Sequence, residues 1–210
     1  MNNSRSAVLM DKAARTISFI FHPLLMPVYD MVIIFSAPTL YAYIPFEVKK
    51  LVILIVLVNN VLLPLSMIPF FIHSRMIASW SMEERQDRVI PLIIIATLYI
   101  ITSYILYRFT VPHFLKSYIM TVGLLSLVAT LINLRWKISL YSMGAGLLLS
   151  VVIMLSVKMY TPLIWYIIPA GIAAGFVLSS RLQLNYHNPG QVWCGFFAGL
   201  LGFSLLILLF

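Results

Sequence analysis

The amino-acid sequence predicts an all-α integral membrane protein, a polytopic helical bundle of six or seven spans. Hydrophobic residues make up 62% of the 210 residues and charged residues only 10%, whereas soluble domains are about 45–50% apolar. The apolar residues gather in seven runs of about 20 residues, the length that crosses a bilayer core. These runs lack the alternation of strands, and in lipid only helices or closed barrels satisfy their own backbone hydrogen bonds. Helices are therefore expected.

The expected spans are separated by short polar connections. In order they cover 17–42, 49–72, 89–109, 114–134, 138–157, 161–179 and 192–210. Residues 1–15 form a polar, amphipathic lead-in, and 16–210 form a single transmembrane domain. The first span is the least regular, because Pro23 and Pro27 interrupt it and proline removes a helix hydrogen bond. One interpretation is an interfacial helix followed by a span from about Leu24.

The charge balance narrows the expected partners. The net charge is +8, from 14 Lys and Arg against 6 Asp and Glu. On a soluble domain this would suggest nucleic-acid binding. Here no basic soluble domain is present, and membrane proteins concentrate cations in loops that face anionic headgroups. Membrane lipids are therefore expected partners and nucleic acid is not. The single cysteine, Cys194, excludes an internal disulfide and a Cys-based metal site.

If all seven segments cross, three connections share one face of the membrane: 74–88, 135–137 and 180–190. These connections hold or adjoin the most reactive side chains, which are Arg85, Arg88, Lys137, Ser139, Arg181 and His187. Such a face suits an anionic headgroup. It carries nine Lys and Arg against five on the other face, but four of the nine are the candidate site itself. The orientation in the membrane therefore stays open.

The third connection contains Ser180-Arg181, then five residues, then His187. Polar residues at a membrane boundary are costly to place there, so they are candidates for function. An arginine binds phosphate through its fork of donors. A neutral histidine can act as a nucleophile or a base.

This segment resembles the last signature of the type 2 phosphatidic acid phosphatase superfamily, SRxxxxxHxxxD. Ser180, Arg181 and His187 match it with the correct spacing, and Gln191 stands at the position of the final Asp. The middle signature, PSGH, resembles residues 138–141 only in Ser139, because Tyr141 stands at the position of the histidine.

The first signature, KxxxxxxRP, is loosely similar to residues 82–91, which contain Arg85, Arg88 and Pro91. The resemblance covers roughly residues 80–200, and the corresponding core is expected over about 80–205. It implies a metal-independent, cofactor-free lipid phosphatase in the bacterial inner (cytoplasmic) membrane. The implied substrates are undecaprenyl diphosphate, phosphatidylglycerol phosphate, phosphatidic acid or lipid A.

The resemblance also implies a role for each matching residue. His187 would attack phosphorus to form a phosphohistidine, and the cations would hold the non-bridging oxygens. Ser139 would donate to the phosphate, Tyr141 would stand in for the proton donor, and Gln191 for the residue that orients the imidazole. The implied phosphate ligands are Arg85, Arg88, Lys137 and Arg181.

Two departures from the family pattern keep the function open. The phenol of Tyr141, with an ordinary pKa of about 10, is a poorer acid at pH 7 than imidazole. Gln191 carries no charge to stabilise an imidazolium. A slow or diphosphate-restricted phosphatase is one expectation, and a catalytically impaired relative that binds or moves phospholipid headgroups is the other. A small-solute transporter is a third hypothesis, but no inverted repeat supports it.

Two further polar residues lie in the first apolar segment. Asp30 is a carboxylate within that segment, where a charge costs about 2.5–3.5 kcal/mol. It is expected either to partner Arg181 or His187, or to be solvated near the boundary. His22 is interpreted as a boundary residue.

Overall fold

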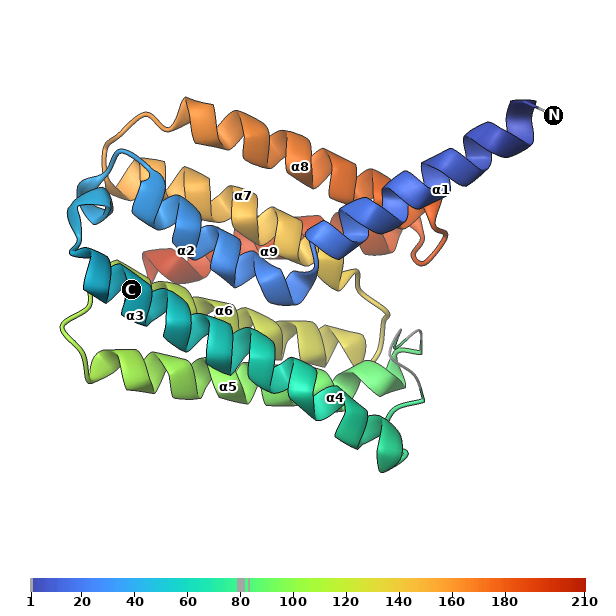
Figure 1. The fold of residues 1–210 in the computed structure, drawn as a ribbon, viewed down its shortest axis with the longest axis horizontal. Helices are drawn as coiled ribbons and strands as arrows, with labels where there is room; N and C mark the ends of the chain where they lie inside the picture. Colours follow the sequence, from blue (N-terminus) through green and yellow to red (C-terminus); the bar gives the residue numbers. More distant parts are fainter. Residues whose placement is uncertain (1, 79–81, 83) are drawn as a thin grey trace.

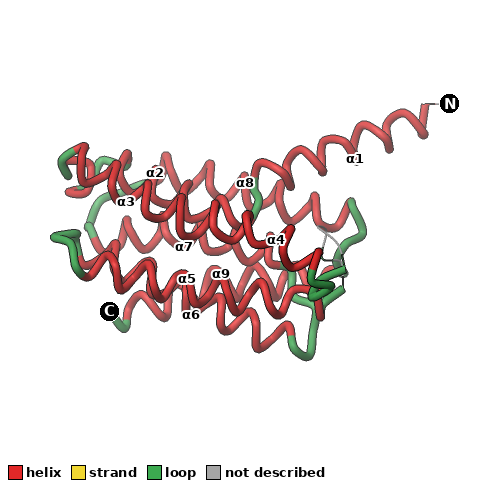
Figure 2. Tube along the Cα trace, turned by 60° about the horizontal axis from the view of Figure 1, so that its bottom comes forward, coloured by secondary structure: helices red, strands yellow, loops and turns green. Residues whose placement is uncertain are grey.

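The computed structural model describes residues 2–78, 82 and 84–210, with side chains from residue 8 onward. This part of the chain forms helices and contains no strand, which confirms the predicted all-α fold (Figures 1 and 2). The α-helices are α1 (Asn2–Ile20), α2 (Met26–Ser36), α3 (Phe46–Leu57), α4 (Leu63–His73), α5 (Val89–Tyr107), α6 (His113–Asn133), α7 (Leu140–Lys158), α8 (Ile164–Gln183) and α9 (Pro189–Leu208).

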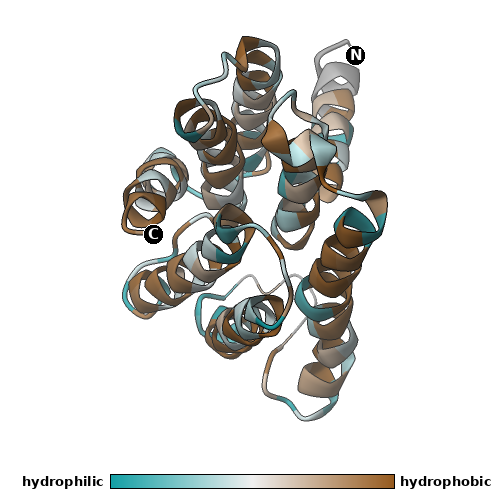
Figure 3. Cartoon of the chain, turned by 90° about the vertical axis from the view of Figure 1, so that its left-hand side faces the viewer, coloured by the Kyte–Doolittle hydropathy of each residue, from teal (hydrophilic) through white to brown (hydrophobic). Residues whose placement is uncertain are grey.

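Seven helical segments in the described residues are long and apolar enough to cross a membrane. They are Val8–Ser36, Phe46–His73, Gln86–Tyr107, His113–Asn133, Leu140–Lys158, Ile164–Gln183 and Pro189–Leu208. Large apolar side chains such as Ile101, Leu131 and Leu205 are exposed on the outside of the bundle, and apolar residues cover most of the helix surfaces in Figure 3. Lipid rather than water suits such surfaces. The chain is therefore an integral membrane protein.

The first segment is broken where the prolines predicted an interruption. Helix α1 ends at Ile20, a 3₁₀ turn covers Pro23–Leu25, and α2 begins at Met26. Pro23 cannot continue the hydrogen-bond ladder of α1, so the chain changes direction. Helix α2 packs in the bundle against α7 and α3, whereas α1 packs along the C-terminal part of α8 and projects beyond the bundle (Figure 1).

Helices α7 and α9 approach each other closely through glycines. A Cβ added at Gly199 would overlap the carbonyl oxygen of Met143, and one added at Gly146 would overlap that of Phe196. The absence of side chains at these positions lets the two backbones touch. The Gly171/Gly175 pair of α8 is also spaced by four residues but makes no such contact, because nothing lies within 4 Å of either added Cβ.

The close pair brings the start of α7 next to the start of α9. The backbone N–H of Ser139 donates to the carbonyl oxygen of Gln191 at 3.3 Å. The connections between α4 and α5, α6 and α7, and α8 and α9 all lie at one end of the bundle, on the right in Figure 1. The described parts of the three connections that the sequence placed on one face therefore lie at the same end of the bundle.

Candidate functional site

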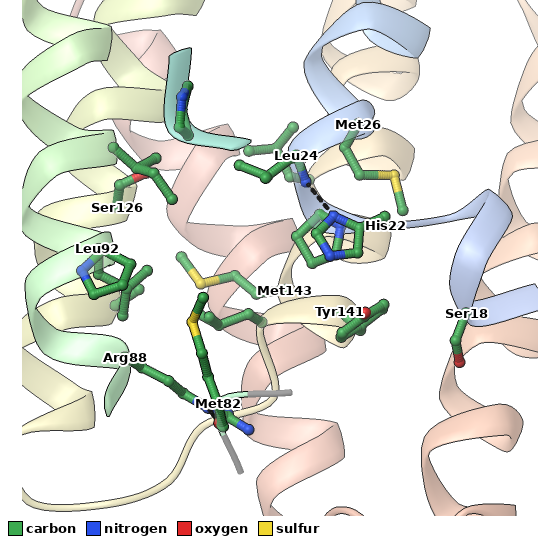
Figure 4. Close-up of a pocket in the computed structure, with 18 of the residues that line it drawn as sticks. Ser18, His22, Leu24, Met26, Met82, Arg88, Leu92, Ser126, Tyr141 and Met143 are labelled. Carbon is green, nitrogen blue, oxygen red and sulfur yellow. Dashed lines mark hydrogen bonds between the residues drawn. The ribbon is translucent and has the colours of Figure 1, made fainter. Parts of the chain in front are cut away.

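A cavity of about 510 Å³ extends from this end of the bundle toward its middle. Helices α4, α5, α6 and α7 supply a lining that is mostly apolar, including Ile68, Leu92, Leu125 and Leu147. The α1–α2 break and the α8–α9 connection line the polar end, and Figure 4 shows His22 of the break together with Tyr141 and Arg88. The cavity therefore combines an apolar interior with a polar mouth.

The polar end of the cavity is cationic. Its basic side chains come from four separate segments, and two histidines and two tyrosines accompany them: Arg15, Arg88, Lys137, Arg181, His22, His187, Tyr141 and Tyr186. No aspartate or glutamate is found in the lining formed by the described residues. The polar end of the cavity is therefore rich in basic side chains.

Arg181 is the most deeply enclosed of these cations. It lies in the last turn of α8 with 6% of its surface exposed. Its guanidinium stacks on the rings of Tyr141 and Tyr186, with Cζ 4.1 Å and 4.7 Å from the two ring centroids. One terminal nitrogen donates to Ser18 Oγ at 3.1 Å, whereas Nε has no partner among the described residues. A buried charge with an unused donor is costly unless an anion binds it.

His187 is held by the local geometry of the α8–α9 turn. Asn185 adopts a left-handed conformation with φ 53°, which ends α8 and reverses the chain. Asn188 then caps α9, and its side chain accepts from the N–H of Gln191 at 2.8 Å. This capping box leaves His187, which is 7% exposed, between the two helices.

The tautomer of His187 follows from Gln191. Gln191 Oε1 accepts from the backbone N–H of Asn188 at 3.3 Å and lies 3.0 Å from His187 Nδ1. An atom that accepts from a backbone N–H is the amide oxygen, so Nδ1 of the imidazole must carry the proton. The neutral ring then has its lone pair on Nε2.

The charge state of His187 is also set by the site. Burial lowers the pKa of the imidazole to about 4, and the positive charges of Arg88, Arg181 and Lys137 act in the same direction. The hydrogen bond from Nδ1 to Gln191 partly opposes this shift. His187 is therefore neutral at pH 7, as a nucleophile must be.

The structure brings five of the predicted site residues together in the cavity lining: His187, Arg181, Tyr141, Arg88 and Lys137. Arg88 also ties the start of α5 to the α6–α7 connection. Its Nε donates to Met82 O at 2.8 Å, and Nη1 donates to Ile138 O at 3.5 Å.

Three predicted residues lie outside the lining. Ser139 is fully buried as the N-cap of α7, and its Oγ accepts from the N–H of Ser142 at 3.3 Å. Gln191 lies behind His187 as described above. Arg85 donates to the carbonyl oxygen of Leu134 at the end of α6. Direct phosphate contacts by Ser139 and Arg85 stay predictions.

Both expectations for Asp30 were wrong. Its carboxylate is 0% exposed, so it is not solvated at a boundary. It accepts a hydrogen bond from Tyr118 Oη at 2.7 Å in the bundle interior and has no hydrogen bond to Arg181 or His187 in the described structure. The burial arises because α2 packs within the bundle rather than lying at the interface.

The sequence did not identify His22 and Ser18 as part of this site. His22 lines the cavity, edge-to-face with the ring of Tyr141 at 5.5 Å, and so adds to the site an imidazole that the sequence interpretation had left outside it. One signal was available. An ionisable residue inside an apolar segment, next to prolines that break the helix, is a candidate for function.

Among the described residues, no group of three or more His, Cys, Asp or Glu side chains could hold a metal ion. Comparisons of the chain with protein-family models, curated proteins and solved structures found no match. The resemblance to the type 2 phosphatidic acid phosphatase superfamily therefore depends on the sequence motifs alone.

Proposed function

We propose that this protein is a membrane phosphatase that releases phosphate from a lipid phosphate or diphosphate through a phosphohistidine at His187. The observation that carries the proposal is the pairing of Arg181 and His187 in one cavity. Arg181 is a buried cation with an unused donor, and His187 is a buried neutral imidazole with its lone pair on Nε2.

The charges support an anionic group at the polar end. Arg15, Arg88, Lys137 and Arg181 line it, and the buried Arg181 has an unused donor at Nε among the described residues. A phosphate dianion accepts several charge-assisted hydrogen bonds and matches the guanidinium fork. The same donors would offset the negative charge that spreads over the oxygens during phosphoryl transfer.

The apolar part of the cavity supports a lipid. Its walls are side chains such as Ile68, Leu92 and Leu147, which offer a water-soluble phosphate nothing to bind. A lipid would place its hydrocarbon chain against these walls and its phosphate at the cationic end. Undecaprenyl diphosphate, phosphatidylglycerol phosphate, phosphatidic acid and lipid A are the proposed substrates, and the bacterial inner membrane is the proposed location.

The proposed reaction has two steps. The lone pair of His187 Nε2 forms a bond to phosphorus while the bond from phosphorus to the leaving oxygen breaks, and the leaving group keeps those electrons. Water then attacks the phosphohistidine, the N–P bond breaks, and inorganic phosphate is released. Over the two steps one water molecule is consumed. Its hydroxyl becomes part of the released phosphate, and its proton goes to the leaving oxygen of a monoester substrate. Gln191 holds Nδ1 so that Nε2 faces the substrate.

A diphosphate substrate suits this site best. Its leaving group is a phosphate, which departs as an anion and requires no strong general acid. Tyr141 stands at the sequence position where the resembling family has its general acid. The centroid of its ring lies 4.1 Å from Arg181 Cζ. General acid catalysis contributes about 10²–10⁴-fold, so monoesters with a basic leaving alkoxide should react more slowly.

A second candidate function is the binding or movement of phospholipid headgroups without turnover. The specific observation in its favour is Gln191, which orients His187 through a neutral amide and supplies no charge to stabilise an imidazolium. In that case the cations would bind the same headgroup, but no phosphate would be released.

Phosphate release from purified protein tests these alternatives. The substrates above are supplied in vesicles or detergent, with a ³²P-labelled terminal phosphate, and the phosphoenzyme is trapped and tested for acid lability. His187→Ala should lose release by about 10³-fold or more. His73→Ala is the matched control, because His73 is exposed at the same end of the bundle and is not part of the cavity lining.

Release that survives in His187→Ala would contradict the phosphohistidine. No release from any substrate by wild-type protein, with headgroup binding retained, would favour the second function.

A further inference from the structure

The cavity contains a second imidazole, which the three signature-like segments do not include. His22 lies in the α1–α2 break, ahead of Pro23, and its ring lines the cavity beside Tyr141 (Figure 4). Because α1 cannot continue through the proline, the backbone at His22 is extended, with φ −67° and ψ 135°. This bend holds the ring within the bundle.

One hydrogen bond fixes the tautomer of His22. The backbone N–H of Leu24 donates to His22 Nδ1 at 3.3 Å, so Nδ1 is an acceptor and carries the lone pair. The proton of the neutral ring must then lie on Nε2. Among the described residues, the His22 ring makes one hydrogen bond, at Nδ1 with Leu24. The Nε2–H group therefore has no acceptor among them.

The two cavity imidazoles are therefore complementary. His187 has its proton on Nδ1 and its lone pair on Nε2, whereas His22 has its lone pair on Nδ1 and its proton on Nε2. Both rings line the same cavity as the Arg181 guanidinium. His22 also touches the ring of Tyr141, which lies under that guanidinium.

We propose that His22 is a substrate-binding residue whose Nε2–H donates to an oxygen of the phosphate group that His187 attacks. This inference rests on the proposed function, and it adds a neutral donor from the α1–α2 break to the cations of the site. His22 keeps the proton on Nε2 during both steps of the reaction. A second proton would have to bind Nδ1, and that nitrogen already accepts from the N–H of Leu24. The ring therefore orients the phosphate and stabilises its oxygen without transferring a proton.

Two substitutions separate this role from simple helix capping. Asparagine places an amide oxygen near the position of Nδ1, so His22→Asn keeps the cap on Leu24 but has no donor at the position of Nε2. Glutamine reaches the position of Nε2 with an amide N–H, so His22→Gln keeps the donor and weakens the cap. A purely structural role would leave His22→Asn like wild type, whereas a ligand role would impair it more than His22→Gln.

The experiment measures phosphate release and binding to phosphatidylcholine vesicles with and without phosphatidic acid, together with the unfolding temperature of each variant. His22→Asn should lose release by about tenfold or more, as expected for a hydrogen bond to a charged group, with an unfolding temperature close to wild type. His22→Gln should lose clearly less.

Equal activity of His22→Asn and wild type would overturn the inference, and so would equal loss in both variants. The behaviour of wild-type protein is read first. If it neither releases phosphate nor prefers vesicles with phosphatidic acid, the proposed function fails and this inference fails with it. If wild type is active and only the His22 comparison fails, the proposed function stands.

Discussion

Two polar regions lie inside this bundle, and they differ in what their charges face. At the end of the cavity, Arg181 is enclosed by aromatic rings, and its Nε has no partner among the described residues. In the middle of the bundle, Asp30 is fully buried, its Oδ2 accepts from Tyr118 at 2.7 Å, and its Oδ1 has no partner among the described residues. The cation faces a cavity large enough for a ligand, whereas the carboxylate faces protein.

This difference indicates function in one region and structure in the other. A buried charge is tolerated when a partner or a ligand satisfies it. Each of the two groups has one side-chain hydrogen-bond partner, Tyr118 for Asp30 and Ser18 for Arg181, and one atom without a partner among the described residues. The difference is that Arg181 lines the cavity, where a ligand can reach it, and Asp30 does not. Substitutions in the cavity should therefore change activity, and substitutions around Asp30 should change stability.

The largest effect in this comparison is expected from Arg181→Ala. Loss of a charge-assisted phosphate contact should reduce phosphate release by about 10²-fold, and affinity for phosphatidic acid vesicles should fall with it. Arg181→Lys should recover only part of the loss, because lysine keeps the charge but not the fork or the stacking between two rings. Arg135→Ala is the control, since Arg135 is exposed at the same end and is not in the lining. Equal losses in Arg135→Ala and Arg181→Ala would show that overall charge matters rather than the cavity.

A smaller effect is expected from Gln191. Gln191→Ala leaves His187 Nδ1 without its acceptor, so the ring loses its orientation and release should fall by about tenfold. The measurement is kcat/KM for the best substrate, with headgroup binding as the control. Unchanged kcat/KM would contradict the assignment of Gln191 as the orienting residue.

The pH dependence sharpens the same point. His187 is active when neutral, and its pKa is lowered to about 4, so kcat/KM should stay flat as pH falls from about 7 and decline only near pH 4. An ordinary histidine would lose activity near pH 6.5. Gln191→Glu places a negative charge beside the ring, which favours the imidazolium and should move the decline to higher pH. A decline near pH 6.5 in wild type would contradict the neutral, buried nucleophile.

The smallest effect on activity is expected from Tyr118→Phe. This change removes the hydrogen bond to Asp30 Oδ2 and leaves a buried carboxylate without it, which should destabilise the protein by about 1–3 kcal/mol. Phosphate release per folded molecule should stay within about twofold of wild type, because Tyr118 is not in the cavity lining. Unfolding in detergent and release at low temperature give the two measurements. A large loss of release without loss of stability would make the Asp30 region part of the functional site.

The sequence alone predicted the helical class, the spans and the shared face of the three connections. The helical class and the spans follow from the length of each apolar run, and the shared face follows from the number of spans between the connections. Both can be read from the sequence without knowing how the helices pack. It also predicted Arg181 and His187 as a pair, because they lie only six positions apart around one turn. The spacing of four residues is common to the glycine pairs of α8 and α9, and only the tertiary structure shows that those of α9 contact another helix and those of α8 do not.

The tertiary structure alone decided which residues share the cavity. His22 joins the site because the chain bends at Pro23 and returns α2 into the bundle, a direction that no local pattern specifies. Arg85 and Asp30 lie outside the cavity lining because each is hydrogen-bonded to α6 or its end. Arg85 donates to the carbonyl oxygen of Leu134, and Asp30 accepts from the hydroxyl of Tyr118. The reason is physical. The apolar pattern determines that a segment is buried in lipid or protein, but which neighbour a polar side chain meets depends on how helices distant in sequence pack.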